Sequence, residues 1–419
     1  MKTLQEVDAY LATLIPRQKS FGDRLSHVVS ILERLEAPQN SIPAIHIAGT
    51  SGKGSTAYYA AAILHEAGYS VGLTVSPHVS KVSERTQVNG TTLPDDEYCT
   101  YVTEFVQCIE ALNESVTYIE FLTCFSFWLF AKLKLDYIVI EVGVGGRLDS
   151  TNVITRDNTV RVITDIGFDH TEILGTTLDA IAREKAGIIH NDDIICMHPQ
   201  NELVMRSVEE AASSHHAKLM IVPDTLKIDG EPIGYQHRNW LLAQYAVNER
   251  LKLGGVPTPS QVAFQRAAQY VIPGRFEVFQ SDDELIILDA AHNPQKMNAF
   301  IDTLKQSYSK NYIIALVSLG KNKEPTAEET LSIIAKGASE VVVTEFTIEE
   351  DDTHGALSAT QLTHLLKEDE ETMMITNAHD ALIYARKKAK LTGGITVVTG
   401  SFYLVSNLRN ELMEEFGKK

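Results

Sequence analysis

The chain has 419 residues, enough for two or three domains that each bury a hydrophobic core. Its formal net charge of −18 argues against broad electrostatic binding to nucleic acid or to an anionic membrane surface, although a locally basic site can still hold small anions. Hydrophobic residues make up 44% of the chain and charged residues 22%, as is ordinary for a soluble globular protein.

Cysteine spacing and apolar stretches narrow the class of protein further. The four cysteines form neither a CxxC pair nor a zinc-binding pattern, so we expect reduced side chains in a cytoplasmic protein. The N-terminal residues lack the apolar region of a signal peptide. The longest apolar window, residues 121–135, contains Lys132 and Lys134 and is too short to span a bilayer, so we expect a buried helix there.

Apolar residues at helical spacing predict two helices within residues 3–36, and Pro16 and Gly22 mark the break between them. The short apolar run of residues 44–48 then predicts a buried strand. The chain turns through three glycines and continues as a helix that Gly68 stops. This arrangement can bind a triphosphate, because glycines let backbone N–H groups approach the phosphates and the helix N-terminus adds positive potential.

The glycine loop differs from the common P-loop, which has four residues between its glycines and a Ser or Thr directly after the lysine. Here only Thr50 and Ser51 separate the first two glycines, and Gly54 separates Lys53 from Ser55. A tight turn with a surface lysine is the simpler interpretation. Three glycines, a lysine and a Ser-Thr pair in one turn favour a phosphate loop instead.

A long polar segment, residues 76–90, follows the next predicted strand, residues 70–75. Ligands bind at the carboxyl ends of strands in open α/β sheets, so this connection is a candidate part of a site, with a solvated loop as the alternative. Two helices are predicted after it, over residues 95–112 and 118–135.

The apolar strand of residues 137–140 ends in a carboxylate, Glu141, and a glycine-rich run over residues 142–152 follows. A continuous apolar strand is typical of a parallel sheet covered on both faces. A carboxylate at the end of such a strand is costly unless it meets a cation. A structural ion pair would meet that need, and so would a magnesium ion, which takes one or two carboxylates where it bridges phosphates.

The strand predicted over residues 161–164 leads to His170, which lies just past a strand end, as Gly52, Ser76 and Glu141 do. A lone histidine is more often a satisfied structural residue than a ligand. Its placement on the same sheet edge makes His170 a candidate for the site. Further along we expect a helix that ends at Gly187, an αβ unit over residues 194–222, and helices over residues 233–251 and 258–271.

Pro273 and Gly274 mark the predicted junction to a second α/β domain. Its strands are expected over residues 276–280, 285–289, 312–317, 340–344, 372–376 and 395–399, with helices between the last five and after residue 401. The strongest stretch is a strand end with Asp289 and His292, followed by a helix with Pro294 near its start.

Seven motifs between residues 44 and about 405 resemble, in order, those of the folylpolyglutamate synthase/dihydrofolate synthase family of the Mur ligase superfamily. They are Gly-Thr-x-Gly-Lys-Gly-Ser at 49–55, Ser-Pro-His…Glu-Arg…Asn-Gly at 76–90, Glu-Val-Gly-x-Gly-Gly-Arg-Leu-Asp-x-Thr-Asn at 141–152, Asp-His with Arg-Glu-Lys-Ala-Gly-Ile at 169–188, Gln-x-x-Asn at 236–239, Asp-x-Ala-His-Asn-Pro at 289–294 and Gly-Ser at 400–401.

The chain departs from the family pattern at several positions. Ser51 replaces an Asn, Tyr235 a His and Ala290 a Gly. Asn322-Lys323-Glu324 takes the place of Asp-Lys-Asp, and His354-Gly355-Ala356 takes the place of Pro-Arg-Ala. The roles of the missing histidine and arginine therefore cannot be carried over.

The resemblance implies an α/β fold: a P-loop-type, mostly parallel nucleotide-binding domain followed by a smaller Rossmann-like C-terminal domain. We expect an ATP-binding Mur-ligase-type domain over residues 1–272, a glutamate-ligase domain over residues 273–419, and the site in the cleft between them. The implied reaction uses ATP to join L-glutamate to the γ-carboxylate of folate or folate polyglutamate through an acyl phosphate. Dihydropteroate is a further candidate acceptor.

The residue types and the resemblance together imply a role for each motif. The residues expected to hold the nucleotide are Thr50, Gly52, Lys53, Gly54, Ser55, Thr56, Gln236, Asn239, Arg275 and Asp289. Those expected to hold magnesium are Ser55, Ser76, Glu141, His170 and Lys185. Those expected on the substrate side are Ser76, Pro77, His78, Glu84, Arg85, His292 and Ser401. The expected catalytic residues are Lys53, Glu141, His170, Lys185 and His292.

Lys185 carries the most specific expectation. A lysine near the C-terminus of a helix is ordinary, because a cation is favourable against the helix dipole there. In the Mur-type ligases that this run resembles, however, the lysine is carbamylated by CO₂, and the carbamate helps to hold a magnesium ion. Carbamate oxygens suit that hard cation. The resemblance therefore implies a carbamylated Lys185.

The implied cofactors are ATP and Mg²⁺, with a monovalent cation such as K⁺ as a further candidate. We expect a monomer that binds neither nucleic acid nor membrane. Three alternatives stay open: a Mur-type peptidoglycan-precursor ligase, a P-loop ATPase switch or motor, and a catalytically inactive binding protein. The 141–152 motif speaks against the first, ADP release that depends on folate and glutamate would exclude the second, and the retained Lys53, Glu141, His170 and His292 argue against the third.

Overall fold

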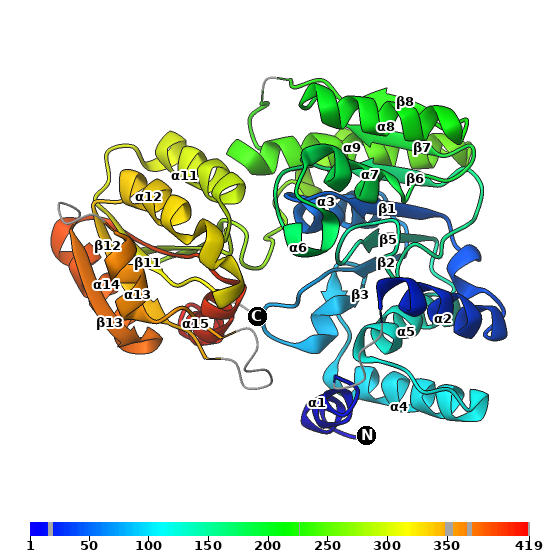
Figure 1. Ribbon diagram of the computed structural model, residues 1–419, viewed down its shortest axis with the longest axis horizontal. Helices are drawn as coiled ribbons and strands as arrows, with labels where there is room; N and C mark the ends of the chain where they lie inside the picture. Colours follow the sequence, from blue (N-terminus) through cyan, green and yellow to red (C-terminus); the bar gives the residue numbers. More distant parts are fainter. Residues whose placement is uncertain (16–19, 226, 348–354, 367–370, 418–419) are drawn as a thin grey trace. The chain divides into compact units, whose positions relative to one another are not determined.

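The computed structural model describes residues 1–15, 20–225, 227–347, 355–366 and 371–417 (Figure 1). Pro16 and His354 lie outside these described residues. The chain divides into two compact units. The first unit contains Met1–Pro232 and Gln236–Tyr270, and the second contains Ile233–Tyr235 and Val271–Lys419.

The first unit is built on an eight-stranded sheet in the order β4-β3-β2-β5-β1-β6-β7-β8 (Figure 1). Its strands are β1 (Ala44–Ala48), β2 (Val71–Thr74), β3 (Thr86–Val88), β4 (Thr91–Thr92), β5 (Tyr137–Glu141), β6 (Val160–Ile163), β7 (Ile194–Met197) and β8 (Lys218–Ile221). The six strands from β2 to β8 in this order pair in parallel, with β1 between β5 and β6. The mostly parallel sheet predicted from the sequence is therefore confirmed, and its central strands are buried along their whole length.

The prediction that residues 76–90 form one irregular loop is wrong at its C-terminal end. Residues 86–88 form β3, which pairs antiparallel with β2. The sequence pattern does not predict this strand, because the side chains of Thr86 and Gln87 are polar, as in a solvated loop. In the structure these polar side chains are buried and hydrogen-bonded. The Thr86 hydroxyl lies 2.7 Å from that of Ser126, and Gln87 donates to the Tyr58 hydroxyl at 2.9 Å.

The helices of the first unit cover the sheet and extend it on one side. They are α1 (Leu4–Ala12), α2 (Phe21–Arg34), α3 (Lys53–Glu66), α4 (Asp95–Leu112), α5 (Tyr118–Lys132), α6 (Thr171–Leu174), α7 (Leu178–Ala186), α8 (Glu202–Ser214), α9 (Gly234–Leu253) and α10 (Gln261–Ala267), with 3₁₀ turns η1 (Pro38–Asn40) and η2 (Val82–Arg85). Among the described residues, no helix is both long enough and apolar enough to cross a bilayer.

Two predicted helix limits are corrected. Gly22 does not break the helices, because it lies in the first turn of α2, where the Ser20 side chain accepts from the Asp23 backbone N–H. The helix expected over residues 258–271 is only α10, because the Ser260 side chain caps its start.

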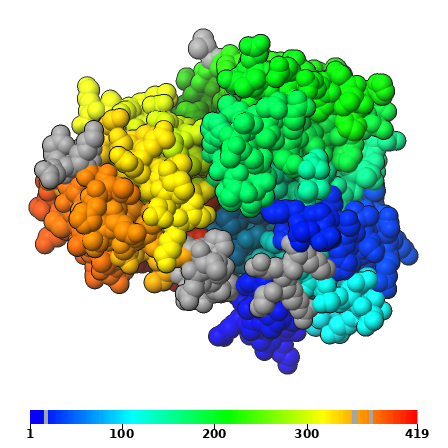
Figure 2. All heavy atoms as spheres, viewed as in Figure 1, coloured from blue at the N-terminus to red at the C-terminus, as the bar shows by residue number. Residues whose placement is uncertain are grey.

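One hydrophobic core of the first unit lies between the sheet and helices α1, α2, α4 and α5. Aromatic rings from α4 and α5 dominate it: the ring centroid of Phe105 lies 5.1 Å from that of Phe121 and 5.7 Å from that of Phe125. The outer faces of α1 and α4 (dark blue and cyan) lie on the surface seen in Figure 2. These helices therefore bury one apolar stripe each.

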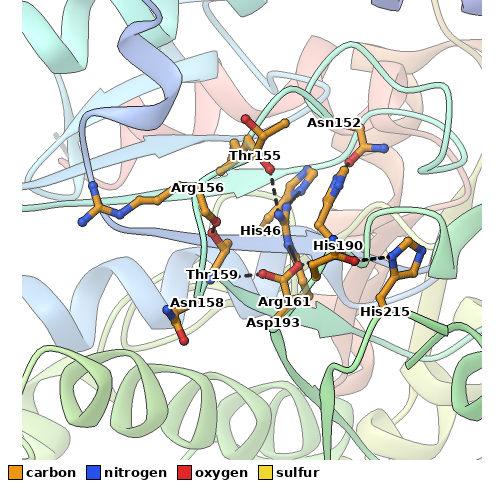
Figure 3. Close-up of polar contacts among 12 residues, drawn as sticks. His46, Asn152, Thr155, Arg156, Asn158, Thr159, Arg161, His190, Asp193 and His215 are labelled. Atoms are coloured by element: carbon orange, nitrogen blue, oxygen red, sulfur yellow. Dashed lines mark hydrogen bonds and ion pairs between the residues drawn. The ribbon is translucent and has the colours of Figure 1, made fainter. Parts of the chain in front are cut away.

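An ion pair lies inside the sheet region of the first unit (Figure 3). Nε of Arg161, on β6, donates to Oδ2 of Asp193 at 2.7 Å, and neither side chain is exposed. Asp193 also accepts the backbone N–H groups of Thr159 and His190. A buried pair of charges is tolerated only when its hydrogen bonds are complete, as they are for this carboxylate.

We expect Asp193→Ala to lower the free energy of unfolding of the first unit by about 3–5 kcal/mol, because Arg161 stays charged and buried without its partner. Urea denaturation followed by circular dichroism measures the change. Asp179→Ala is the matched control, since Asp179 pairs with Arg183 at an exposed position and such pairs contribute about 0–1 kcal/mol. Equal losses in the two variants would contradict this account of the buried pair.

The second unit is built on a six-stranded sheet in the order β13-β12-β11-β14-β10-β9. Its strands are β9 (Glu277–Gln280), β10 (Leu285–Asp289), β11 (Ile313–Val317), β12 (Glu340–Glu345), β13 (Thr372–Asn377) and β14 (Ile395–Thr399), and all pair in parallel except β9 with β10. Its helices are α11 (Pro294–Tyr308), α12 (Ala327–Gly337), α13 (Ala359–Leu365), α14 (Ala378–Thr392) and α15 (Phe402–Glu415), with the 3₁₀ turn η3 (Lys321–Thr326). The predicted alternation of strands and helices is confirmed.

Candidate active site

The glycine loop joins the end of β1 to the start of α3. Gly52 has φ of 91°, and a Cβ atom there would lie 2.2 Å from Oδ1 of Asn239. Glycine is therefore required both for the backbone conformation and for the close approach of α9. The backbone N–H groups of Thr50 and Ser51 donate to the Asp165 carbonyl at 2.9 and 3.0 Å, which fixes the loop to the segment after β6.

The N-terminus of α3 begins directly at this loop. Gly52 occupies the N-cap position, and no side chain caps the helix. Lys53 is the first helical residue, and Ser55 and Thr56 are buried behind it. The buried Thr56 hydroxyl has no hydrogen-bond partner among the described residues. Uncapped N–H groups, a lysine and hydroxyls at a helix N-terminus fit phosphate oxygens.

Helix α9 is held against the glycine loop by an ion pair that the sequence analysis did not assign. The guanidinium of Arg238 donates to Asp165 through Nε at 3.0 Å and Nη2 at 2.9 Å. Gln236 and Asn239, on either side of it in the chain, are both buried in the first unit. The predicted nucleotide residues of α9 therefore lie beside the loop because Asp165 anchors the helix.

Glu141 ends β5 and is buried, as a strand-end carboxylate was expected to be. Its Oε2 accepts the backbone N–H of Ser76 at 2.9 Å, which joins two predicted metal-binding residues from neighbouring strands β5 and β2. A Cβ atom on Gly143 would lie 4.0 Å from Oγ of Ser76 and 3.2 Å from Oδ2 of Asp149. These contacts place the 142–152 segment next to Glu141 and Ser76.

The polar segment after β2 is held together by Glu84. Its two carboxylate oxygens accept the backbone N–H groups of Val79 at 2.7 Å, Ser80 at 3.0 Å and Lys81 at 3.1 Å. This gives Glu84 a role inside the loop, which the sequence analysis did not foresee. Its predicted contact with substrate stays a prediction.

His78 and Arg85 form a pair within the same segment. Arg85 Nε donates to Nδ1 of His78 at 2.9 Å, and its guanidinium carbon lies 5.7 Å from the ring centroid of Tyr118. Burial, assisted by the Arg85 charge, lowers the pKa of His78 to about 3. His78 is therefore neutral at physiological pH with its proton on Nε2, because a guanidinium can only donate.

His170 and Lys185 both lie in the segment between β6 and β7, at the start of α6 and near the end of α7. His170 has φ of 50° at the N-cap of α6, and its Nδ1 lies 3.7 Å from Oε1 of Glu172. Lys185 is buried in the last turn of α7, and its Nζ donates to the Gly49 carbonyl at 2.8 Å. The structure therefore brings Lys185 into direct contact with the glycine loop through this hydrogen bond.

The donor atoms of the first unit suit a hard divalent cation. Ser55 and Ser76 offer hydroxyl oxygens and Glu141 a carboxylate, the ligand types that Mg²⁺ prefers. Glu141 ends β5, Ser76 follows β2, and Ser55 lies in the first turn of α3, the helix after β1; these three strands are neighbours in the sheet. No group of three or more His, Cys, Asp and Glu side chains in the described parts of the chain could hold a metal by itself.

The second unit contains Asp289, Arg275, His292 and Ser401. Oδ2 of Asp289 accepts the Tyr235 hydroxyl and, at 2.9 Å, the backbone N–H of Phe276, and burial raises the pKa of this carboxyl. Tyr235, where the family pattern has His, thus provides a hydrogen-bond donor to Asp289. No sequence signal indicated this contact.

His292 and Arg275 both lie against Phe402, the first residue of α15. The ring centroids of His292 and Phe402 are 5.8 Å apart. The guanidinium carbon of Arg275 lies 4.2 Å from the ring centroid of Phe402. Nδ1 of His292 donates to the Ala290 carbonyl at 2.8 Å, and Lys296, which the sequence analysis missed, approaches Nε2 to 3.0 Å. Arg275, His292 and Lys296 together give this edge of the second unit cationic and imidazole groups suited to anions.

The predicted site residues fall into two groups. The first unit holds Thr50, Gly52, Lys53, Gly54, Ser55, Thr56, Ser76, Pro77, His78, Glu84, Arg85, Glu141, His170, Lys185, Gln236 and Asn239, and the second holds Arg275, Asp289, His292 and Ser401. Within each unit they follow the carboxyl ends of parallel strands or lie on the helix or loop beside them.

Known proteins share both the domains and the whole fold. Residues 47–220 match the Mur ligase middle domain and residues 274–402 the glutamate ligase domain of Mur ligases. The chain is 30% identical to the dihydrofolate synthase/folylpolyglutamate synthase of Bacillus subtilis, over 93% of this chain and 94% of that protein. It is 32% identical to the dihydrofolate synthetase of Saccharomyces cerevisiae, over 77% of this chain and 81% of that protein.

Solved structures agree with these relatives. The Mycobacterium tuberculosis folylpolyglutamate synthase complexed with ADP and AMPPCP superposes with a TM-score of 0.84 at 26% identity, over 98% of each chain. The bifunctional folylpolyglutamate synthase/dihydrofolate synthase of Yersinia pestis complexed with AMPPNP and Mn gives a TM-score of 0.83 at 28% identity, again over 98% of each chain. The chain therefore belongs to the dihydrofolate synthase/folylpolyglutamate synthase family of Mur ligases.

Proposed function

We propose that this chain is an ATP-dependent ligase that joins L-glutamate to the γ-carboxylate of folate or folate polyglutamate. The observation that carries this proposal is the uncapped N-terminus of α3 behind the glycine turn at Gly52, in a chain whose relatives are folate ligases. That turn binds phosphates, and the second unit supplies a separate group of cationic and imidazole side chains.

The chemistry requires activation, because a carboxylate is a poor acyl donor at neutral pH. The γ-phosphoryl group of ATP moves to a carboxylate oxygen of folate, so that a new P–O bond forms as the bond to ADP breaks. The glutamate amine then attacks the acyl carbon, inorganic phosphate leaves, and the nitrogen loses a proton. Positioning and charge neutralisation account for most of the catalysis in such phosphoryl transfers.

The nucleotide is assigned to the phosphate loop and its neighbours. We propose that the loop from Thr50 to Thr56 holds the β- and γ-phosphates through backbone N–H groups and the Lys53 ammonium. Gln236 and Asn239 on α9, with Arg275 and Asp289 of the second unit, are assigned to the rest of the nucleotide. Asp289 also accepts hydrogen bonds from the Phe276 backbone N–H and the Tyr235 hydroxyl. These bonds support a second role for Asp289, which is to hold both residues in place.

Magnesium is assigned to Ser55, Ser76, Glu141, His170 and a carbamylated Lys185. The bound cation would neutralise phosphate charge during transfer. The chain's own contribution is to hold the Glu141 carboxylate through the Ser76 N–H and to orient oxygen ligands at the strand ends.

The glutamate side is assigned to His292 and Ser401. Ser401 caps α15 through a hydrogen bond to the Tyr403 N–H at 3.1 Å, and His292 lies beside the same helix start. His78 and Arg85, with Pro77, are assigned to the folate side. We also propose that the chain works as a monomer in the cytoplasm, without nucleic acid or membrane, as its net charge of −18 favours.

Dihydropteroate is the second candidate acceptor. The Saccharomyces cerevisiae relative is named a dihydrofolate synthetase, and the Bacillus subtilis relative carries both names. Ligation of glutamate to dihydropteroate uses the same activation of a carboxylate.

Incubation with ATP, Mg²⁺, L-glutamate and either folate or dihydropteroate, followed by mass spectrometry, tests the proposal. We expect products longer by one glutamyl residue, and unchanged acceptors in both reactions would contradict the proposal.

Glu141→Gln should lose metal-dependent activity by about 10- to 100-fold while ADP affinity changes much less, because Lys53 and the loop N–H groups remain. Activity measured against Mg²⁺ concentration, with ADP binding measured by calorimetry, separates the two effects. Equal weakening of both would contradict the assignment of Glu141 to the metal.

A further inference from the structure

The buried Arg161–Asp193 pair belongs to a larger set of hydrogen bonds (Figure 3). Arg161 on β6 lies beside His46 of β1 in the register of the sheet. Its Nη2 donates to the Ile154 carbonyl at 2.8 Å, and its Nη1 lies 2.8 Å from Nδ1 of His46. With Nε bound to Asp193, all three guanidinium nitrogens are engaged, and His46 is as fully buried as the ion pair.

The contact with Arg161 fixes the tautomer of His46. A guanidinium can only donate, so Nδ1 of His46 accepts and Nε2 carries the proton. Nε2 therefore donates to the Thr151 hydroxyl, 2.9 Å away, and this hydroxyl donates to Oδ1 of Asp149 at 2.5 Å. Each hydrogen bond on this path has only one possible direction. Burial, with the charge of Arg161, holds the pKa of His46 well below its usual value, which keeps the ring neutral.

A second path starts from the same ion pair. Oδ2 of Asp193 accepts the backbone N–H of His190 at 2.8 Å, and Nε2 of His190 lies 2.9 Å from Oδ1 of Asn152. The Asn152 amide donates in turn to the Gly187 carbonyl at 3.0 Å. Gly187 directly follows α7, the helix that carries Lys185.

The two paths pass through consecutive residues, Thr151 and Asn152, of the segment that follows Glu141. We call this segment, residues 142–152, the β5 loop. Inside it, Oδ2 of Asp149 accepts the Val144 backbone N–H at 3.0 Å. The first path therefore runs from the ion pair to the beginning of the β5 loop.

The beginning of the β5 loop lies against Ser76. The position of a Cβ atom on Gly143 would be 3.2 Å from Oδ2 of Asp149 and 4.0 Å from Oγ of Ser76. The Ser76 backbone N–H in turn donates to Glu141. A displacement of Asp149 would thus be transmitted to the backbone just after Glu141 and to Ser76, the residue that Glu141 binds.

We propose that Thr151 and His46 are positioning residues for the divalent cation, and that the buried Arg161–Asp193 pair anchors them. The Thr151 hydroxyl accepts from His46 and donates to Oδ1 of Asp149. The Thr151 backbone N–H donates to the same oxygen at 2.9 Å, so the hydroxyl adds the link between His46 and the position of Asp149. This inference rests on the proposed function, in particular on Glu141 as a metal ligand.

The free-energy cost of burying two charges supports a positioning role for the Arg161–Asp193 pair. Replacing a buried ion pair by apolar side chains of similar volume is often neutral or stabilising, so stability alone does not require Arg161 and Asp193. An arginine at this position does something that an apolar residue cannot do: it forces a single tautomer on His46 and a single direction on the hydrogen bonds that follow.

The test compares two substitutions of Thr151 with a control. Thr151→Val keeps the shape of the side chain and removes the hydroxyl, whereas Thr151→Ser keeps the hydroxyl. Thr155→Val is the matched control, because the exposed Thr155 binds Asn40 and lies outside both paths. Binding of Mn²⁺ to each full-length protein with saturating ADP is measured from the electron paramagnetic resonance signal of free Mn²⁺.

We expect the Mn²⁺ dissociation constant to rise about 10-fold in Thr151→Val and to stay within about twofold of wild type in Thr151→Ser and Thr155→Val. A residue with only a structural role would lower the folded fraction without changing the affinity of the folded protein. Equal weakening in Thr151→Val and Thr151→Ser, or unchanged binding in Thr151→Val, would overturn the inference.

Glu141→Gln separates this inference from the proposed function. If Glu141→Gln leaves Mn²⁺ binding unchanged, the proposed metal site is wrong. If Glu141→Gln weakens binding and Thr151→Val does not, the positioning role is wrong and the metal site stands. The wild-type protein gives an independent check that needs no variant: ¹⁵N spectra of labelled histidine should show the proton of His46 on Nε2, and a proton on Nδ1 would refute the path.

Discussion

Lys53→Ala is expected to reduce glutamate ligation by at least about 10²–10³-fold, the effect of removing one group that stabilises charge in a transition state. Lys53 is the first residue of α3, next to the Gly52 turn, and supplies the only side-chain ammonium within the loop from Thr50 to Thr56. The backbone N–H groups remain in the variant, so ADP should still bind, more weakly. ADP release under saturating substrates measures the loss.

The fold should survive this change, because substitutions away from the core usually alter stability by about 0.5 kcal/mol or less. Lys252→Ala is a suitable control: it removes a lysine of the same unit whose side chain is 71% exposed on α9. Near wild-type turnover in a folded Lys53→Ala protein would refute the assignment of the phosphate loop.

Lys185→Ala is expected to be nearly inactive, with a loss of about 100-fold or more. Nζ of this buried lysine donates to the Gly49 carbonyl at 2.8 Å, so the side chain reaches the phosphate loop from α7. An amine in such a place can attack CO₂ when it is neutral, and the carbamate would offer two oxygens to magnesium. Acetate or another small carboxylate at millimolar concentration should then restore part of the activity of Lys185→Ala.

A second variant separates the carbamate from a simple hydrogen bond to Gly49. Lys185→Arg keeps a cationic donor but cannot form a carbamate, so it should be as inactive as Lys185→Ala if the carbamate matters. ¹³C-bicarbonate should also give a carbamate signal in wild type that is absent from both variants. Full activity of Lys185→Ala, together with no ¹³C signal in wild type, would exclude the carbamate.

Local patterns in the sequence predict most of the fold. The short, mostly apolar run that became β1 and the continuous apolar run that became β5 are buried along their length, as parallel central strands must be. The pattern failed where polar side chains are buried in pairs: Thr86 and Gln87 of β3 looked like a loop because their partners, Ser126 and Tyr58, are distant in the sequence.

The candidate site likewise contains contacts between distant residues that local sequence patterns do not predict. Gly52 and Lys53 could be predicted from local spacing, because a phosphate loop is built from consecutive residues. The Asp165–Arg238 ion pair, the loop-holding role of Glu84 and the contact of Tyr235 with Asp289 could not be assigned, since each depends on how separate segments meet. The sequence analysis assigned no role to His46, because the direction of its hydrogen bonds depends on the sheet register that places it beside Arg161.

The relatives restrict the alternatives that the sequence left open. A peptidoglycan-precursor ligase and a P-loop switch share the phosphate chemistry, yet the curated relatives from Bacillus subtilis and Saccharomyces cerevisiae, compared over most of their length, are named as folate enzymes. What distinguishes the three functions is which molecules must be present for ATP to be consumed.

The most direct test of the central claim is therefore ADP release measured with tetrahydrofolate and with dihydropteroate in separate reactions, each with and without L-glutamate. The account predicts that, with at least one of these acceptors, ADP appears only when both the acceptor and L-glutamate are present, and that Lys53→Ala abolishes it. ADP release that continues at the same rate without either the acceptor or L-glutamate would contradict the proposed ligase.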